Sequence, residues 1–513
     1  MNEVLDISQF RENNRYEAKL AQGGLPGSIW ETYSAFANTD GGLILLGVKE
    51  NKNHTFEIAG LENPESLLSA FWDTVNNQNK VSLNILMNKH VRIQEIEGKK
   101  IICIEVPRAE RQLKPIYIGN NILTGTFHRN GEGDYRCTKE DVSEMLRDAS
   151  ATTADTKILK EMDESVFCPD TIKAYRNVFR NTHINHVWES LDDVDFLRKI
   201  GAMGFSKETG SLHPTAAGLL MFGYEYEIVR EFPLYFLDYQ EKYDDAIRWT
   251  DRIVSSSGEW SGNVFDFFFK IATKLTADIK RPFKLEGFFR VDDTSVHKAV
   301  REALVNTLVN ADYYGRQGLV VQKYPNKFVF ANPGSFRIPL KEAFDGGTSD
   351  PRNATMLKMF AMIDIGERAG SGIPGIIATW EKEFNLKPQY IQTFSPSRTK
   401  TVLNLNDLQE SSYPEIDAET RVENKKTREG NNISTLVNDS SDGKTRVENE
   451  KTRVEILNLI KENPNIKTVE LAEKLFITKK GVEWQLKQLR DDGLIRHVGA
   501  TKNGHWEIIK GEH

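Results

Sequence analysis

The chain has 513 residues, of which 39% are hydrophobic and 27% are charged, and its formal net charge is −7. This length exceeds what one hydrophobic core supports and favours about three or four domains. No apolar run approaches the ~20 residues that cross a bilayer, and the first residues lack the pattern of a signal peptide. We therefore expect a cytoplasmic protein with no membrane partner.

The chain has three cysteines, Cys103, Cys137 and Cys168, and no C-x-x-C pair. This pattern argues against a disulfide scaffold and against a classical zinc site, because lone cysteines usually behave as small buried hydrophobic residues. A zinc site built from Cys103, Cys137 and a histidine such as His128 is the alternative.

Residues 1–150 are expected to form a compact α+β unit. The segments RYEAKLA and LILLGV predict strands, and VRIQEI and KIICIEV predict a hairpin that turns at Gly98. Two helices, IWETYSAFANT and KEDVSEMLRD, follow Ser28 and Thr138, which we expect to cap them.

The loop VPRAERQLKPIY places three cations between two prolines, which restrict its backbone, and an aromatic residue follows. Cations interleaved with aromatic residues are typical of proteins that bind RNA or single strands. We therefore predict that Arg108, Arg111, Lys114 and Tyr117 contact nucleic acid. The alternative for Tyr117 is a position in the core.

Three stretches resemble the Schlafen AlbA_2 family: ENNRYEAK, SAFANTDGGLILLGVKE and VPRAERQLKPIY. Some relatives are endoribonucleases of tRNA and rRNA with a metal site of three carboxylates. The resemblance implies Glu12, Glu17 and Glu50 as the matching ligands of Mg²⁺ or Mn²⁺, although the family usually has Asp at the third position. Lys19 shares a strand face with Glu17 and would steady a phosphate, unless the two form a structural ion pair.

Residues 151–290 are expected to be a mixed α/β region that connects its neighbours. Pro169 stands where a helix would begin, and HPTAAGLLMFG predicts a turn followed by an apolar helix. No chemistry is predicted for this region.

Residues 291–408 open with the helix SVHKAVREALVNTLVNA. Its E-x-x-x-N-x-x-x-N pattern places Glu302, Asn306 and Asn310 four residues apart, so all three lie close to one face of the helix. This pattern resembles the N-box of the GHKL ATPases, and later Asn-Pro-Gly and Gly-rich stretches stand where that superfamily contacts adenine and phosphates. The resemblance implies an α/β sandwich that binds ATP, with Mg²⁺ held through Asn306. The candidate cofactor contacts are Glu302, Asn306, Asn310, Asn332, Gly334, Gly370 and Gly372.

The same module resembles the ATP-binding-like domain of some proteins named RecG helicases. Motor motifs and a G-x-x-x-x-G-K-[ST] loop are absent from the sequence, which excludes a helicase. Asn332 stands where the superfamily has an adenine-binding aspartate, and its amide would accept a hydrogen bond without charge. The alternative is a degenerate module kept for dimerisation or for another ligand.

Residues 409–451 are polar and are expected to be a flexible linker, in which TRVENKKTR at Thr420 begins again as TRVENEKTR at Thr445. Residues 452–513 predict three helices and two strands, which is the pattern of a winged helix-turn-helix, with Trp506 in its core. The third helix would enter the major groove, although winged helices also bind proteins. Its predicted DNA contacts, with one on the wing, are Lys479, Lys480, Trp484, Lys487 and Lys502.

The predicted fold class is therefore α+β and multidomain. The order of modules resembles a bacterial family described as predicted transcriptional regulators, which implies a DNA-binding regulator with an ATP-responsive switch, acting as a homodimer. One alternative is a metal-dependent endonuclease of tRNA, other RNA or DNA that acts in phage defence. Another is an interaction scaffold in which both sites are inactive.

Overall fold

The computed structural model describes residues 15–51, 55–243, 248–279, 294–366 and 370–405, the strands at 285–286 and 289–290, and parts of 456–508. The chain divides into two compact units, Met1–Ser411 and Ser412–His513. Helical and strand residues are described in both units, and the predicted α+β class is confirmed. Within the described residues, no helix combines the length and apolar character that crossing a membrane requires.

The N-terminal module is built on a four-stranded sheet. Its strands, in spatial order, are β1 (Tyr16–Lys19), β2 (Gly42–Leu46), β6 (Lys99–Val106) and β5 (Val91–Ile96). The pair β1–β2 is parallel and the other two pairs are antiparallel. Helices α1 (Ile29–Asn38) and α2 (Pro64–Val75) pack their apolar side chains with those of β2 and β6. The predicted strands and the hairpin at Gly98 are confirmed.

The module continues through short elements to a capped helix. These elements are β3 (Val48–Glu50), β4 (Phe56–Ile58), α3 (Ile122–Gly125), β7 (Phe127–Asn130), β8 (Gly133–Arg136) and α4 (Lys139–Ala149). Thr138 caps α4 as predicted, because its hydroxyl oxygen accepts the Asp141 N–H. The predicted cap at Ser28 is wrong: its backbone already has helical angles, and its side chain makes no capping bond.

The next segment is mostly helical. Its elements are α5 (Pro169–Thr182), α6 (Asp193–Ile200), β9 (Met203–Ser206), β10 (Ser211–Pro214), α7 (Ala216–Phe222) and α8 (Glu225–Glu231). Every residue of α7 is buried, so the predicted apolar helix is confirmed. Single-turn 3-10 helices connect elements along this unit: η2 (Asn88–His90), η3 (Arg111–Leu113), η4 (Ala154–Thr156), η5 (Glu164–Val166), η6 (Val187–Ser190) and η7 (Ser255–Ser257).

A six-stranded sheet forms the centre of the first unit. Its strands, in spatial order, are β12 (Asp251–Val254), β11 (Leu237–Glu241), β15 (Leu319–Lys323), β16 (Lys327–Pro333), β18 (Ser397–Asn404) and β17 (Gln389–Phe394). The boundary predicted at residue 290 therefore cuts through one sheet, because β12 and β11 precede it and β11 pairs with β15, which follows it. One continuous core runs from Leu159 to Leu403.

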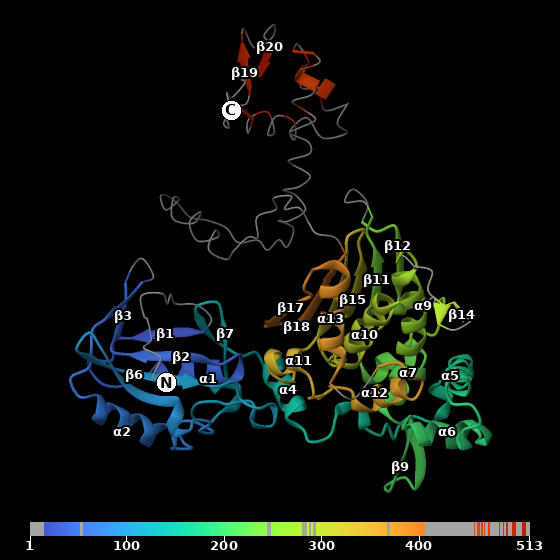
Figure 1. The fold of residues 1–513 in the computed structure, drawn as a ribbon, viewed down its shortest axis with the longest axis horizontal. Coiled ribbons are helices and arrows are strands. Elements are labelled where there is room, and N and C mark those ends of the chain that lie inside the picture. Colours follow the sequence, from blue (N-terminus) through green and yellow to red (C-terminus); the bar gives the residue numbers. More distant parts are fainter. Residues whose placement is uncertain are drawn as a thin grey trace. The chain divides into compact units, whose positions relative to one another are not determined.

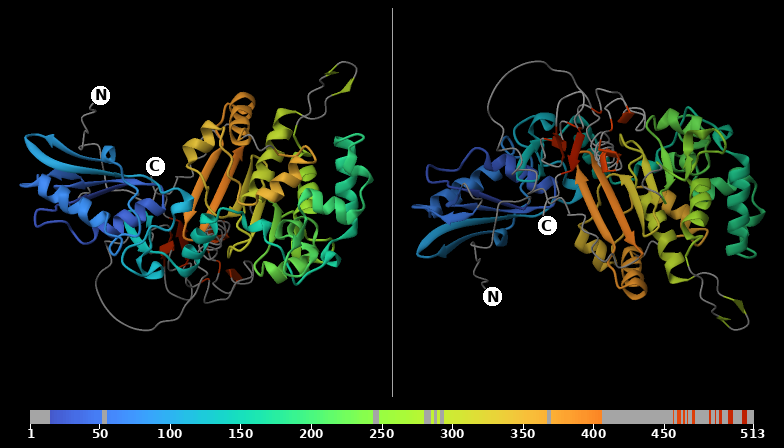
Figure 2. Two further views of the ribbon diagram at one scale, coloured as in Figure 1. Left: turned by 90° about the horizontal axis from the view of Figure 1, so that it is seen from below. Right: turned by 90° about the horizontal axis from the view of Figure 1, so that it is seen from above.

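Helices cover this sheet. They are α9 (Val264–Thr276), α10 (Ser295–Val309), α11 (Leu340–Asp345), α12 (Ala354–Ala361) and α13 (Gly372–Phe384), and a small hairpin of β13 (Leu285–Glu286) and β14 (Phe289–Arg290) precedes α10. Figure 1 shows α10 and α13 side by side in front of the sheet. The views in Figure 2 distinguish the blue strands of the N-terminal module from the green-to-orange strands of the central sheet.

The second unit has a small core of its own. β19 (Ile495–Val498) and β20 (His505–Ile508) form an antiparallel hairpin. Val482, Leu486 and Leu489 are buried, as the helical spacing predicts, and Trp506 packs against the same cluster.

Candidate functional site

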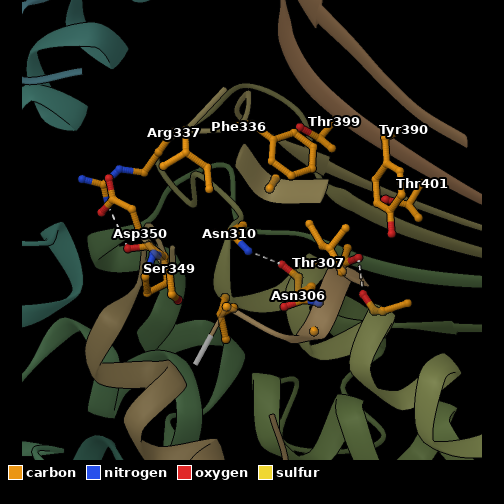
Figure 3. Close-up of a pocket in the computed structure, with 18 of the residues that line it drawn as sticks. Asn306, Thr307, Asn310, Phe336, Arg337, Ser349, Asp350, Tyr390, Thr399 and Thr401 are labelled. Carbon is orange, nitrogen blue, oxygen red and sulfur yellow. Dashed lines mark hydrogen bonds and ion pairs between the residues drawn. The ribbon is translucent and has the colours of Figure 1, made fainter. Parts of the chain in front are cut away.

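A pocket opens between α10, α13 and the six-stranded sheet, and the empty space within it and at its open mouth is about 930 Å³. A concave site with several convergent polar groups is the usual form of a small-molecule site. Figure 3 shows side chains from α10 facing side chains from the sheet: Asn306, Thr307 and Asn310 lie opposite Thr399, Thr401 and Tyr390.

The three polar residues of the predicted N-box all line this pocket. Asn306 Nδ2 donates to Glu302 Oε1 at 3.2 Å, and Asn310 Nδ2 donates to the Asn306 carbonyl at 2.9 Å. The pocket wall thus holds a carboxylate beside an amide, and oxygen donors of both kinds are ligands that Mg²⁺ accepts.

Gly370 and Gly372 line the same pocket, where the chain enters α13. A Cβ at Gly372 would lie 2.1 Å from Glu302 Oε1 and 3.2 Å from Asn306 Nδ2, so a side chain at this position would displace the Glu302 carboxylate. The first turn of a helix has N–H groups without intrahelical partners and carries partial positive charge. Phosphate oxygens bind readily at such a position.

Asn332 and Gly334 lie at the end of β16 and differ in role. Asn332 is buried in the pocket wall and donates a hydrogen bond to the Pro333 carbonyl at 3.1 Å. Gly334 is not part of the pocket lining, contrary to the sequence prediction. It has a φ of +93°, and a Cβ there would lie 2.1 Å from Arg352 Nη1. Glycine at this position therefore makes room for Arg352.

The sequence reading missed the polar floor of the pocket. Thr399 and Thr401 project from β18, and Tyr390 on β17 is the register partner of Thr401. The Tyr390 hydroxyl is buried and has no hydrogen-bond partner among the described residues, and burial together with the charge of Glu302 raises its pKa. A sheet face under a helix is normally apolar, so polar groups there indicate a ligand site. The sequence Thr399-Lys400-Thr401 in β18 could have indicated these polar groups, because alternate residues of a strand lie on one face.

The opposite end of the pocket carries a buried ion pair that was also missed. Arg337 and Asp350 line it, with Arg337 Nη1 3.6 Å from Asp350 Oδ1. Arg337 Nη1 also donates to the Pro351 carbonyl at 2.8 Å, and its side chain is only 3% exposed. The pocket therefore has a cationic group at the end away from Tyr390.

This end of the pocket is also where the N-terminal module contacts the central one. Arg111 forms an ion pair with Asp350, and Arg108 donates a hydrogen bond to the Phe336 carbonyl. Both arginines belong to the loop that the sequence assigned to nucleic acid. Their side chains are only 11% (Arg108) and 14% (Arg111) exposed.

Lys114, the third cation of that loop, donates to the Asn38 carbonyl at 2.6 Å. Burial and the charge of Arg108 lower its pKa well below the ordinary value for lysine. Acceptors within the chain hold all three cations, so in this structure they do not face a nucleic acid as predicted. Tyr117 is half-buried and pairs with Thr126 through its backbone.

The predicted carboxylate triad is only partly described, because Glu12 lies outside the described residues. Glu17 is buried on β1, with one carboxylate oxygen 2.7 Å from Lys19 Nζ and the other 2.9 Å from Arg129 Nη1. Glu50 is half-buried at the end of β3. Both carboxylate oxygens of Glu17 thus take part in ion pairs. This agrees with the alternative given above, in which Glu17 and Lys19 form a structural ion pair.

The predicted DNA contacts of the second unit, Lys479, Lys480, Trp484, Lys487 and Lys502, lie outside the residues whose side chains the structure describes. Arg496 on β19 is exposed and pairs with Glu507 at 2.8 Å.

Family models match four segments of the chain. Residues 6–138 match "Schlafen, AlbA_2", and residues 449–496 match "Winged helix-turn-helix DNA-binding". The chain carries a Schlafen AlbA_2 domain and a winged helix-turn-helix. Residues 317–399 match HATPase_c_4, described as "Putative ATP-dependent DNA helicase recG C-terminal", and residues 143–238 match DUF8451, a domain of unknown function. The predicted domain composition is confirmed.

The AlbA_2 domain and the winged helix both belong to families that point to nucleic acid as the partner. The HATPase_c_4 match spans β15 to β18 and includes Asn332, Gly370 and Gly372, whereas the N-box helix α10 precedes it.

Two solved structures resemble the chain in part. The DIP2311 protein from Corynebacterium diphtheriae is 17% identical, with 96% of this chain and 91% of that one covered at a TM-score of 0.38. The N-terminal domain of a RecG-related protein from Nitrosomonas europaea is 27% identical, with 26% of this chain and 86% of that one covered at a TM-score of 0.20. No curated protein matches the chain.

Proposed function

We propose that this protein is a DNA-binding transcriptional regulator whose state depends on a nucleotide in the central pocket. The observation that carries the proposal is the convergence of Glu302, Asn306, Asn332 and Gly372 on one pocket, in a chain that also has a winged helix. These residues come from separate elements, α10, β16 and the start of α13.

ATP with Mg²⁺ is the ligand that this donor set suits. Asn306 and Glu302 would hold the ion, the first turn of α13 would face the phosphates, and Asn332 beside Thr399 would receive the base. A switch requires a change of charge at the site. Bound ATP would bring negative charge into the pocket, and its hydrolysis would change that charge. Because Asn332 replaces a charged acceptor, we expect binding with slow turnover.

The winged helix would supply the DNA contact, with its third helix in the major groove. In a homodimer, two such domains on flexible linkers would gain affinity through effective concentration. The ion pair of Arg111 with Asp350 joins the pocket wall to the AlbA_2 domain. A ligand that moves Asp350 would therefore also move Arg111 of that domain.

The test is ATP binding by the full-length protein, measured by calorimetry with Mg²⁺, followed by DNA affinity with and without ATP. Asn306→Ala should lose ATP binding and any effect of ATP on DNA affinity. Asn177→Ala, at an exposed position on α5, is the matched control and should retain both. ATP binding that survives Asn306→Ala, or DNA affinity that ATP leaves unchanged, would refute the proposal.

A further inference from the structure

Three metal-ligating side chains meet inside the N-terminal module, away from the central pocket. His128 lies on β7, Cys137 follows β8, and Asp141 lies in the first turn of α4. Their ligand atoms all lie within 4.8 Å of one another, and His128 Nδ1 is 3.5 Å from Cys137 Sγ. Among the residues that the structure describes, no other three His, Cys, Asp or Glu side chains are grouped so closely.

The backbone brings these residues together for local reasons. The β7–β8 hairpin returns the chain so that His128 and Cys137 become neighbours, and the cap at Thr138 fixes the start of α4 directly afterwards. The N–H and the hydroxyl of Thr138 both donate to Asp141 Oδ2 at 2.8 Å. Metal-binding carboxylates are usually held by hydrogen bonds of this kind, and here they leave Oδ1 for an ion.

We propose that His128, Cys137 and Asp141 form a binding site for Zn²⁺. A thiolate, an imidazole and a carboxylate are ligands that zinc accepts together, whereas Mg²⁺ and Ca²⁺ take oxygen ligands. Tetrahedral zinc with ordinary bond lengths requires sulfur and nitrogen ligands roughly 3.6 Å apart. The observed 3.5 Å between Cys137 Sγ and His128 Nδ1 meets this requirement without rearrangement.

Charge and space also suit a divalent ion. A thiolate and a carboxylate would together neutralise Zn²⁺, which matters because the three side chains are only 4–8% exposed. His128 and Asp141 also line a small, partly open cavity, from which a water molecule would complete the coordination as a fourth ligand. The same cavity lining includes the cations Arg108, Arg111, Lys114 and Arg337 and the carboxylates Glu144 and Asp148.

The competing explanation is a hydrogen bond between a neutral thiol and a neutral imidazole. Burial raises the pKa of Cys137 to about 12 and lowers that of His128, so both groups are neutral while no ion is bound. Cys103, which the sequence placed in a zinc site, lies on β6 in a separate cluster beside Gln94. It is therefore not a ligand, and it provides the matched control.

The test uses Co²⁺ as a spectroscopic substitute for zinc in the full-length protein after removal of metal. We expect about one Co²⁺ per chain, with a thiolate-to-cobalt band in the near ultraviolet and tetrahedral d–d bands, and displacement of both by Zn²⁺. Cys137→Ser and His128→Gln should lose the bands, and Cys103→Ser should retain them. Circular dichroism identifies a variant that has not folded.

A wild-type protein without a thiolate band would overturn the proposal. So would a band that persists in Cys137→Ser or disappears in a folded Cys103→Ser. If Cys137→Ser fails to fold, His128→Gln still decides the matter, because it keeps the thiol and removes the second ligand.

Discussion

Arg352 and Asp148 form a two-bond ion pair between the central module and α4 of the N-terminal module. Nε and Nη2 of Arg352 lie 3.0 and 2.6 Å from the two carboxylate oxygens of Asp148. Burial opposes ionisation of Asp148, but the charge of Arg352 and its hydrogen bonds outweigh it and hold the pKa of Asp148 below its usual value. The pair helps to hold the two modules in one unit.

Asp148→Asn should lower the free energy of unfolding at pH 7 by about 3 kcal/mol, because it leaves the buried Arg352 without its main charge partner. Since the folded pKa of Asp148 is depressed, its stabilisation is present at neutral pH and is lost as pH falls through that pKa. Urea unfolding measures the change. Asp193→Asn removes an exposed pair with Arg176 and should change stability by less than about 1 kcal/mol. Equal losses in the two variants would contradict this assignment.

Glu144 lies one turn before Asp148 on the same helix and should make stability depend on pH in the opposite sense. Burial raises its pKa to about 7, despite the opposing charge of Arg352, whereas an unfolded glutamate titrates near about 4.3. The folded chain therefore binds the proton more tightly, and stability should fall as pH rises between these values, by at most about 1.4 kcal/mol per unit. Unfolding of Glu144→Gln across this range should lack that loss.

The matched control for that experiment is Glu140→Gln, because Glu140 lies on the same helix with its side chain 52% exposed. The free energy of unfolding of Glu140→Gln should change with pH in the same way as that of the parent. The same pH dependence in Glu144→Gln would show that Glu144 titrates normally.

Gly372→Ala should weaken nucleotide binding, because the added Cβ would meet Glu302 Oε1 at 2.1 Å and displace the carboxylate that we propose as a ligand of the ion. Gly375 is three residues further along α13 and has no atom within 4 Å of an added Cβ. Gly375→Ala should therefore keep nucleotide affinity, and should stabilise the helix by up to about 1 kcal/mol. Calorimetry with ATP and Mg²⁺ compares them, and equal affinities would place the ligand away from α13.

Arg111→Ala should leave the affinity of the full chain for duplex DNA unchanged, because Arg111 pairs with Asp350. Lys479→Ala and Lys480→Ala should each weaken binding and reduce the slope of log affinity against log salt by about 1. Lys387→Ala removes an exposed cation of the central module and is the control. Binding weakened by Arg111→Ala as much as by Lys480→Ala would mean that this loop leaves Asp350 to contact DNA.

Glu17→Ala separates the structural role of this carboxylate from nuclease chemistry. Because Glu17 pairs with Lys19 and with the buried Arg129, we expect the variant to be destabilised. We also expect tRNA, single-stranded DNA and duplex DNA to stay intact with the parent protein in Mg²⁺ or Mn²⁺ on a denaturing gel. Discrete cuts by the parent that vanish in Glu17→Ala would instead support the endonuclease alternative.

The sequence predicted those parts of the site that local geometry determines. Glu302, Asn306 and Asn310 lie on one helix, and a period of 3.6 residues is enough to put them on one pocket wall. Arg111 and Asp350 are separated by 239 residues, and their contact depends on how two modules dock, which no local pattern encodes. The cations of the loop at residues 107–115 therefore suggested contacts with phosphates. In the folded chain, Arg108 and Arg111 pair instead with the carboxylates of Asp40 and Asp350. Tyr390 was missed because an edge-strand tyrosine is a common core residue.

The parallel pairing of β11 with β15 limits how the chain can be divided. A fragment that starts at residue 291, as the sequence boundary suggested, would lack β11 and turn β15 into a free edge. That edge would present unpaired N–H and C=O groups beside the buried Leu319 and Val321. Exposed apolar edges of this kind join other chains edge to edge, so the fragment should aggregate where the longer chain does not.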